Sequence, residues 1–389
     1  MPVPTAPTFR DRVHGCLLGG AVGDALGAAV EFRSIDEIRA RFGPAGIADP
    51  AEAYGRVGAI TDDTQMTVFT ADGLIRAAVR GRTNGIVHAP TVVDHAYGRW
   101  LAALGERGGR WDDGAPDGWL VDLPALGAWR SPGRTCLSAM RAPAAGTIAS
   151  PINHSKGCGG VMRIAPVGLL DGPRDVFALG CDLAALTHGH PSGYLTAGAM
   201  ALLIGRLVAG DGLDEALDAV EARLVAETPP PTATAGIAPA TASGTAATTG
   251  TDNDTEAAER AETLVAVRGA RALAAAGAAP GPETVAGLGL GWVADEALAI
   301  AVYCALVAED FAHGVRLAVN HSGDSDSTGA MTGSILATLH GAAVIPDRLL
   351  ADLELRAEIT RLADDWVAVF GPDPADLESG DLARRYPGW

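Results

Sequence analysis

Two acidic stretches, far apart in the chain, combine carboxylate and hydroxyl side chains. Residues 61–64 read TDDT and precede apolar residues at helical spacing, whereas residues 324–328 read DSDST and follow a glycine. Each stretch has an ordinary explanation, since such residues cap helix N-termini and form solvated turns. A helix needs only one cap, however. Adjacent carboxylates also repel each other, and this repulsion is relieved when their oxygen atoms bind one cation. We therefore predict that the two stretches share divalent metal ions.

The N-terminal region combines regularly spaced glycines with two carboxylates. Glycines recur at every fourth position from Gly15 to Gly27, which places them along one face of a helix and favours close packing against a second helix. Asp24 lies within this apolar run and Glu31 just after it. A buried carboxylate is costly without a partner or a task, so both residues are candidates for function.

A glycine-rich loop and a pair of histidines complete the candidate set. Residues 155–163 read SKGCGGVMR, and glycines at this density let backbone N–H groups approach a phosphate or a sugar. The order of a P-loop is absent, and Cys158 is more readily explained as a small buried thiol than as a nucleophile. His188 and His190 stand two residues apart, which does not match the i, i+4 spacing of a helical zinc pair. Two roles remain open for these histidines: a structural position at a helix boundary and a contact with substrate.

Helical periods dominate the rest of the chain, so we predict an all-α fold. Apolar residues recur at helical spacing in residues 64–80, and residues 179–209 and 292–308 are Ala/Leu-rich runs of helical length. Residues 227–256 are rich in Pro, Ala, Thr and Gly and have almost no large apolar side chains. Such a segment predicts a disordered insertion. We place it inside a single domain that spans residues 1–389, because candidate site residues lie on both sides of it; a linker between two domains is the alternative.

Composition excludes several classes of partner. The net charge is 29 − 47 = −18 and the pI is about 4.8, so we expect no nucleic-acid surface and no anionic-membrane surface. The five cysteines are odd in number and scattered, which favours the reducing cytoplasm over a disulfide framework. Residues 15–30 are too short to span a bilayer and contain Asp24, so we expect no transmembrane or signal segment.

The ordered set of motifs resembles the ADP-ribosylglycohydrolase family, which includes dinitrogenase reductase activating glycohydrolase and the ADP-ribosyl-acceptor hydrolases. Each block is short, but five blocks in the family order make a specific pattern. The matching segments are 23–31, 61–64, 157–163, 187–188 and 323–327. The resemblance implies a compact, orthogonal all-α bundle with two Mg²⁺ ions, or Mn²⁺, in a cleft.

The resemblance also assigns roles to individual residues. It implies that Glu31 acts in catalysis or gates the site, with Asp62 and Asp63 as the remaining candidate bases. The loop of Gly157, Cys158, Gly159 and Gly160 would hold the diphosphate or distal ribose, with His188 beside it. The implied metal ligands are Thr61, Asp62, Asp63, Asp324, Asp326 and Ser327, and Thr328 competes with Ser327 for the last position.

The implied activity is hydrolysis of the glycosidic bond in ADP-ribose conjugates, with release of ADP-ribose. Such a reaction passes through an oxocarbenium-like transition state and uses carboxylates, and two divalent ions would balance the four aspartates. The substrate would be an ADP-ribosylated protein or a small ADP-ribosyl compound, and the acceptor stays open among Arg, Ser, a nucleobase and an O-acetyl group. Two alternatives remain: another Mg²⁺-dependent hydrolase acting on a nucleotide or phosphate ester, and a non-catalytic, crystallin-like member.

Overall fold

The computed structural model describes residues 6–106, 110–111, 117–170, 172, 174–228, 249–375 and 380–387, with only the helical backbone of residues 249–254. Within these residues the fold is all-α, as predicted, with 17 helices, three short 3₁₀ turns and one small hairpin. The elements are α1 Phe9–Gly27, α2 Ile35–Phe42, β1 Glu52–Ala53, β2 Arg56–Val57, α3 Asp62–Asn84, α4 Ala89–Ala103, α5 Arg134–Arg141, η1 Cys158–Gly160, α6 Ala165–Gly168, α7 Val176–Ala185, α8 Pro191–Ala209, α9 Leu213–Glu227, α10 Thr249–Ala275, α11 Pro282–Val285, η2 Ala286–Leu288, α12 Ala294–Leu306, α13 Phe311–Val319, α14 Ser325–His340, η3 Ala342–Val344, α15 Asp347–Leu350, α16 Arg356–Phe370 and α17 Asp381–Arg385.

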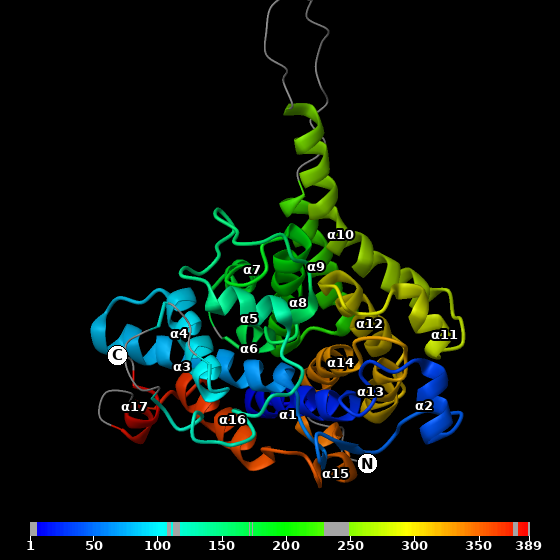
Figure 1. Ribbon diagram of the computed structural model, residues 1–389, viewed down its shortest axis with the longest axis horizontal. Coiled ribbons are helices and arrows are strands. Elements are labelled where there is room, and N and C mark those ends of the chain that lie inside the picture. The colour runs from blue at the N-terminus through cyan, green and yellow to red at the C-terminus, as the bar shows by residue number, and fades with distance from the viewer. Residues whose placement is uncertain are drawn as a thin grey trace, which may run out of the picture.

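The packing of α1 against α14 forms the centre of the molecule (Figure 1). A capping box starts α1, because the Thr8 hydroxyl accepts from the Asp11 amide while the Asp11 carboxylate accepts from the Thr8 amide. The glycine face then meets the backbone of α14. A Cβ atom placed on Gly19 would lie 2.5 Å from the Gly333 carbonyl oxygen, and one on Gly27 would lie 2.3 Å from that of Ser325. The two helices therefore run antiparallel at near backbone contact, and the end of α1 meets the start of α14.

A two-residue hairpin between α2 and α3 is the one sheet in the described part of the chain. Glu52 pairs with Val57, and the turn residues Tyr54 and Gly55 have φ angles of 51° and 80°. Two positive φ angles are typical of the type I′ turn, whose twist matches that of the strands. This hairpin lies beside the segment before α5, because the Arg130 guanidinium lies 5.1 Å from the centre of the Tyr54 ring.

Helix α8 is the one described helix long and apolar enough to cross a membrane, by length and composition. In this structure 72% of its most apolar window is buried inside the protein. Its neighbours include α7, α9 and α10. The central helix of a globular core has the same composition, because it is apolar on all sides.

The predicted insertion, residues 227–256, has two parts in the structure. Residues 229–248 lie outside the described residues, whereas residues 249–256 form the first turns of α10. The Arg260 side chain of α10 donates from Nε to the Glu227 carbonyl oxygen at 3.0 Å, so the end of α9 lies against α10. The buried apolar side chains on either side of this segment join one hydrophobic cluster.

Candidate metal and active site

The structure brings ten of the twelve predicted site residues to one pocket of about 630 Å³. Thr61 and Gly160 are the two that do not line it. Each is adjacent in the sequence to a residue that does. The pocket is formed by the turn that follows α1, the N-termini of α3 and α14, the glycine loop, the segment before α5 and the first residues of α5. The predicted residues that line it are Glu31, Asp62, Asp63, Gly157, Cys158, Gly159, His188, Asp324, Asp326 and Ser327.

Asp24 fixes the first acidic stretch in place. Its carboxylate accepts hydrogen bonds from the Thr61 amide at 3.0 Å and the Thr61 hydroxyl at 2.8 Å. It also accepts from the amide of Thr64 at 3.0 Å and from the hydroxyl of that residue. The side chain is fully buried, and these donors offset part of the cost of desolvating the carboxylate. Asp24 is therefore a positioning residue that holds the start of α3 against α1.

The first turn of α3 presents Asp62 and Asp63 to the pocket. Thr61 caps the helix, and the amide of Asp62 donates to the Arg130 carbonyl oxygen at 3.2 Å. Asp62 in turn accepts from the backbone amide of Gly133 at 3.2 Å. The Oδ2 atom of Asp63 is buried without a hydrogen-bond partner in the described residues. The helix cap predicted for this stretch is present, and it leaves both carboxylates free to face the pocket.

The second acidic stretch starts α14. Asp324 is the N-cap residue, and Asp326 and Ser327 occupy the first turn. The Thr328 hydroxyl donates to the backbone, with the Ala318 carbonyl oxygen at 2.7 Å, and Thr328 does not line the pocket. Ser327 does line it, so Ser327 is the hydroxyl that the structure places beside the carboxylates.

Five carboxylates share the pocket, and burial and mutual repulsion shift their pKa values in one direction. Burial, then Asp326 and Asp324, raise the pKa of Glu31 to about 11. Burial and the Asp326 charge likewise raise the pKa of Asp62 and of Asp63 well above the ordinary value. Burial raises the pKa of Asp324 and of Asp326 as well. The N-termini of α3 and α14 offset part of this repulsion. Five buried carboxylates so close together require bound protons or bound cations to neutralise their charge.

The donor atoms of this cluster fit a hard divalent cation. Oxygen atoms of Glu31, Asp324 and Asp326 lie within 4.8 Å of one another. Within the described residues, Glu31 Oε2, Asp63 Oδ2 and Asp326 Oδ1 are buried without a hydrogen-bond partner. Unpaired buried carboxylate oxygens carry a high desolvation cost, which metal coordination would remove. Glu31, predicted as a catalytic residue, thus also belongs to the set of carboxylates that could hold metal.

The glycine loop is fixed beside the second acidic stretch. Gly157 pairs with Val293 in an isolated β-bridge, and the amide of Cys158 donates to the Trp292 carbonyl oxygen at 3.2 Å. The Cys158 thiol donates to Asp324 Oδ2 at 2.7 Å, so this cysteine belongs to the pocket wall. Burial and Asp324 raise its pKa well above the ordinary value, which keeps the thiol protonated.

The two neighbouring histidines have different places. His188 lines the pocket, whereas His190 caps α8 and its Nδ1 atom accepts from the Ser192 amide at 3.0 Å. His154, His190 and Glu259 form a second group close enough to hold a metal. The Ser192 bond places the proton of neutral His190 on Nε2, 3.6 Å from a Glu259 oxygen. An Nε2–H group cannot ligate a metal, so we interpret this group as a His–Glu contact.

Aromatic side chains that no sequence motif predicts form a rim around the pocket. Phe32 and Trp292 stack at the pocket mouth with ring centres 5.3 Å apart and an angle of 17° between the planes. Trp129 lines the pocket as well, and all three rings are solvent-accessible. Phe32 has a φ of 63°, a conformation that non-glycine residues rarely adopt, and it directly follows Glu31. Neither the stack nor the backbone conformation has a local sequence signal.

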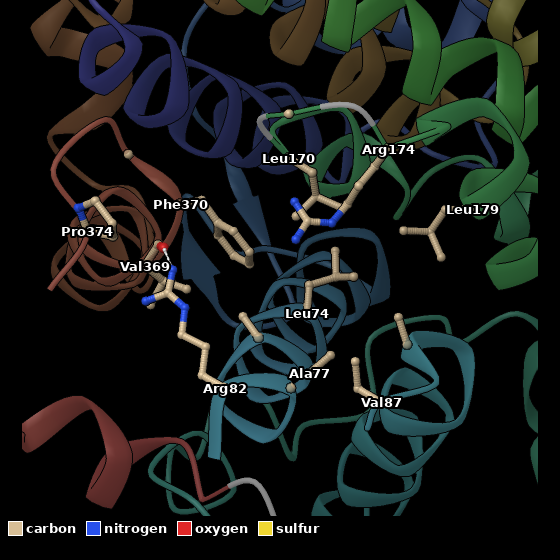
Figure 2. Close-up of a pocket in the computed structure, with 15 residues that line it drawn as sticks. Leu74, Ala77, Arg82, Val87, Leu170, Arg174, Leu179, Val369, Phe370 and Pro374 are labelled. Atoms are coloured by element: carbon tan, nitrogen blue, oxygen red, sulfur yellow. Dashed lines mark hydrogen bonds between the residues drawn. The ribbon is translucent and has the colours of Figure 1, made fainter. Parts of the chain in front are cut away.

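A second pocket, of about 350 Å³, lies between α3, α4 and the end of α16 (Figure 2). Leu74, Leu179 and Phe370 are among its apolar lining residues, and Arg82 donates to the Val369 carbonyl oxygen at 3.2 Å. Its described lining residues include no carboxylate, so it lacks the acidic side chains that converge in the first pocket.

Comparison with known proteins gives matches along nearly the whole chain. Residues 5–375 match the family model described as ADP-ribosylglycohydrolase. ADP-ribosyl-[dinitrogen reductase] glycohydrolase of Rhodospirillum rubrum is 25% identical over 379 residues, covering 95% of this chain and 100% of that protein. The uncharacterized protein YegU of Escherichia coli (strain K12) is 25% identical over 88% of this chain and 92% of its own length. A solved structure titled ADP-ribosylglycohydrolase-related protein complex covers 92% of this chain and 97% of its own, with a TM-score of 0.56 and 24% identity, and therefore shows the shared fold.

Proposed function

Because the chain belongs to the ADP-ribosylglycohydrolase family, we propose that it is a divalent-metal-dependent hydrolase that releases ADP-ribose from ADP-ribosyl conjugates. The observation that carries the proposal is the convergence of Glu31 with two acidic helix N-termini in one pocket. The glycine loop and His188 lie on the same pocket wall, where a diphosphate or ribose could bind. The proposed substrate is an ADP-ribosylated protein side chain or a small ADP-ribosyl compound.

The carboxylates and the adjacent hydroxyl groups would hold the metal. We propose two Mg²⁺ ions, with Mn²⁺ as a substitute, because four aspartates balance two divalent charges. Such cations would supply positive charge that polarises the oxygen atoms of water and of the ribose. The proposed ligands are Thr61, Asp62, Asp63, Asp324, Asp326 and Ser327. Thr61 already donates to Asp24 and accepts from the Asp63 amide, which leaves one lone pair for this purpose.

Glu31 is the proposed general base. Its Oε2 atom is buried at the pocket without a hydrogen-bond partner in the described residues, so it can accept a proton from a water molecule. Positive charge at Asp324 and Asp326 would favour the ionised form of this carboxylate, because those two aspartates now oppose it. Asp62 and Asp63 are the alternatives for this role.

The rim of the pocket is where the acceptor would leave. Phe32 directly follows the proposed base, and Trp292 directly precedes the residue that pairs with the glycine loop. The stack therefore connects the two halves of the pocket at its mouth. We also propose a reducing compartment such as the cytoplasm, because all five cysteines are free thiols.

A substrate panel tests the proposal. Arginine-linked and serine-linked ADP-ribosyl peptides, an ADP-ribosyl nucleobase and O-acetyl-ADP-ribose are each incubated with Mg²⁺ or with EDTA, and free ADP-ribose is quantified. We expect Mg²⁺-dependent release from at least one conjugate. Release that is equal in EDTA would contradict metal dependence, and a panel without any release would contradict the proposed activity.

The shared metal site is tested independently of turnover. Asp324→Ala removes one of the converging carboxylates and should abolish most of the Mn²⁺ binding measured by calorimetry. Asp122→Ala serves as the control, because Asp122 is exposed and lies outside the pocket. Binding of two ions at full strength to Asp324→Ala would show that the two acidic stretches do not share a site.

A further inference from the structure

His188 lies between the glycine loop and a buried arginine. Its side chain is only 1% exposed, yet it lines the pocket. The Nε2 edge of the ring faces the loop, since Cβ atoms placed on Gly157 and Gly159 would lie 3.5 and 3.3 Å from Nε2. Nε2 has no hydrogen-bond partner among the described residues. This nitrogen is therefore free to contact a ligand held by the loop.

The opposite edge of the ring contacts Thr187, which is bound by Arg163. Arg163 is fully buried and donates from Nη2 to the Thr187 hydroxyl oxygen at 2.8 Å. The same hydroxyl oxygen lies 2.8 Å from His188 Nδ1. A guanidinium group has donors and no acceptor, so it occupies one lone pair of the threonine oxygen. The direction of the Thr187–His188 bond then depends on where the hydroxyl proton points.

The backbone acceptor beside that hydroxyl is already occupied by two amides. The hydroxyl could donate only to the Ala184 carbonyl oxygen, at 3.4 Å, or to His188 Nδ1. The Ala184 carbonyl oxygen already accepts the amides of Thr187 at 3.0 Å and His188 at 2.9 Å, which uses both of its lone pairs. The hydroxyl therefore donates to Nδ1. In neutral histidine the single ring proton then resides on Nε2.

We propose that Arg163 and Thr187 are positioning residues that hold neutral His188 in the Nε2–H tautomer, so that Nε2–H donates to a phosphate oxygen of the bound ADP-ribose. The identity of this ligand rests on the proposed function, whereas the tautomer does not. In the other tautomer Nε2 would present a lone pair to the anionic phosphate, which repels it. The glycine loop on the same side offers backbone N–H groups for the remaining phosphate oxygens.

The electrostatic surroundings keep the imidazole neutral. Burial and the Arg163 charge lower the pKa of His188 to about 3. The same charge favours a lone pair on Nδ1, the edge that faces Arg163 through Thr187. His188 is thus a fixed hydrogen-bond donor and not a proton shuttle at neutral pH.

Nitrogen-15 NMR of the ligand-free protein tests the tautomer directly. The ring nitrogens of selectively labelled histidines report which nitrogen carries the proton, and the His188 signals are those absent from the His188→Gln spectrum. We expect Nδ1 unprotonated and Nε2 protonated from pH 6 to pH 8. A proton on Nδ1 in the unmodified protein would overturn the proposal. Thr187→Val, which keeps the shape but removes the hydroxyl, should give a mixture of the two tautomers. Thr187→Ser, which keeps the hydroxyl, should retain the Nε2–H tautomer alone.

A matched pair of substitutions tests the donor. The amide of His188→Gln can place an N–H group near the position of Nε2, whereas the shorter side chain of His188→Asn reaches only the position of Nδ1. We expect ADP-ribose to bind about tenfold more weakly to His188→Asn, the loss of one hydrogen bond to a charged group, and nearly normally to His188→Gln. Equal affinities, with both variants folded by thermal melting, would overturn the donor role. Failure of the unmodified protein to bind ADP-ribose would count against the proposed function, and the NMR result would still decide the tautomer.

Discussion

Gly23 of α1 and Gly329 of α14 are in backbone contact: a Cβ atom on Gly23 would lie 2.0 Å from the Gly329 carbonyl oxygen. This contact is among the closest between α1 and α14, two of the helices that position the site. Asp24, which binds the first acidic stretch, follows Gly23, and Asp326 precedes Gly329 by one turn. The glycine face of α1 therefore determines how far Asp24 and Glu31 lie from the carboxylates of α14.

Gly23→Ala should destabilise the protein by about 3 kcal/mol, since the added methyl group meets backbone atoms that cannot move aside. Denaturant unfolding measures this loss. Gly269→Ala is the matched control, because Gly269 lies in α10 and a Cβ atom there would meet nothing within 4 Å. That change should stabilise the protein by about 0.5–1 kcal/mol, the usual gain from replacing a helical glycine. Equal effects at the two positions would contradict the close-packing explanation.

Asp24→Asn should weaken metal binding although Asp24 does not line the pocket. The carboxylate accepts from both the amides and the hydroxyls of Thr61 and Thr64, and the amide nitrogen of asparagine cannot accept these bonds. The start of α3 would shift, and Asp62 and Asp63 with it. Calorimetry with Mn²⁺ should show at least tenfold weaker binding, the effect usual for residues that orient metal ligands. Unchanged binding would limit Asp24 to a structural role.

Without divalent cations, the protein should be more stable at pH 5 than at pH 8. The raised pKa values, about 7 for Asp24 and about 11 for Glu31, mean that these carboxyl groups bind more protons in the folded state than in the unfolded state above about pH 4. Stability therefore falls as pH rises through this window, by about 1.4 kcal/mol per pH unit for each additional bound proton. Thermal melts in EDTA across this range measure the slope.

Mg²⁺ should raise the melting temperature more at pH 8 than at pH 5, because the cation replaces protons on the same carboxylates.

Asp326→Asn should flatten the pH dependence seen in EDTA, since the Asp326 charge raises the pKa of Asp62 and Asp63. A melting temperature that rises with pH in EDTA would show that the cluster does not control acid–base stability.

The parts of the site that depend on local chemistry were predictable from the sequence. A TDDT stretch caps a helix because of hydrogen bonds within one turn, and the glycines at every fourth position mark a packing face because of helical geometry. The structure confirms both for α3 and α1. The all-α fold follows from the same periodicity, and the shared carboxylate and hydroxyl composition of the two acidic stretches, together with the family resemblance, predicted their juxtaposition.

The parts that depend on contacts between distant segments were not predictable. Glu354 accepts from the Ile60 amide at 3.2 Å and from Arg130 at 3.1 Å, which fixes the approach to the first acidic stretch. The Gly133 amide that binds Asp62 has no motif of its own. Such pairings depend on tertiary packing, and a single sequence does not reveal it. The same holds for the stack of Phe32 on Trp292.

Residues 229–248 should be replaceable by a linker of Gly and Ser without loss of stability. Arg260 binds the Glu227 carbonyl oxygen, so the first eleven residues of α10, about 16 Å of helix, separate Thr249 from the end of α9. A linker of about eight residues reaches roughly 26 Å and covers this distance. The melting temperature should change by no more than a few degrees, because closure cost rises slowly with loop length. A larger decrease would show that the replaced segment packs against the rest of the protein.

Glu31→Gln should separate binding from turnover. The substitution preserves the shape of the side chain and removes a carboxyl group that must take up a proton on folding at pH 8, because burial, Asp326 and Asp324 raise its pKa to about 11. Metal-free stability should therefore rise slightly at pH 8, and ADP-ribose binding should stay near normal. If Glu31 accepts the proton of the attacking water, release of ADP-ribose should fall by about 10²–10⁴-fold, the usual contribution of a general base. Unchanged turnover would remove Glu31 from the chemistry and leave Asp62 or Asp63 as the base. A loss of Mn²⁺ binding measured by calorimetry would instead show that Glu31 acts mainly as a metal ligand, as its distance to Asp324 and Asp326 permits.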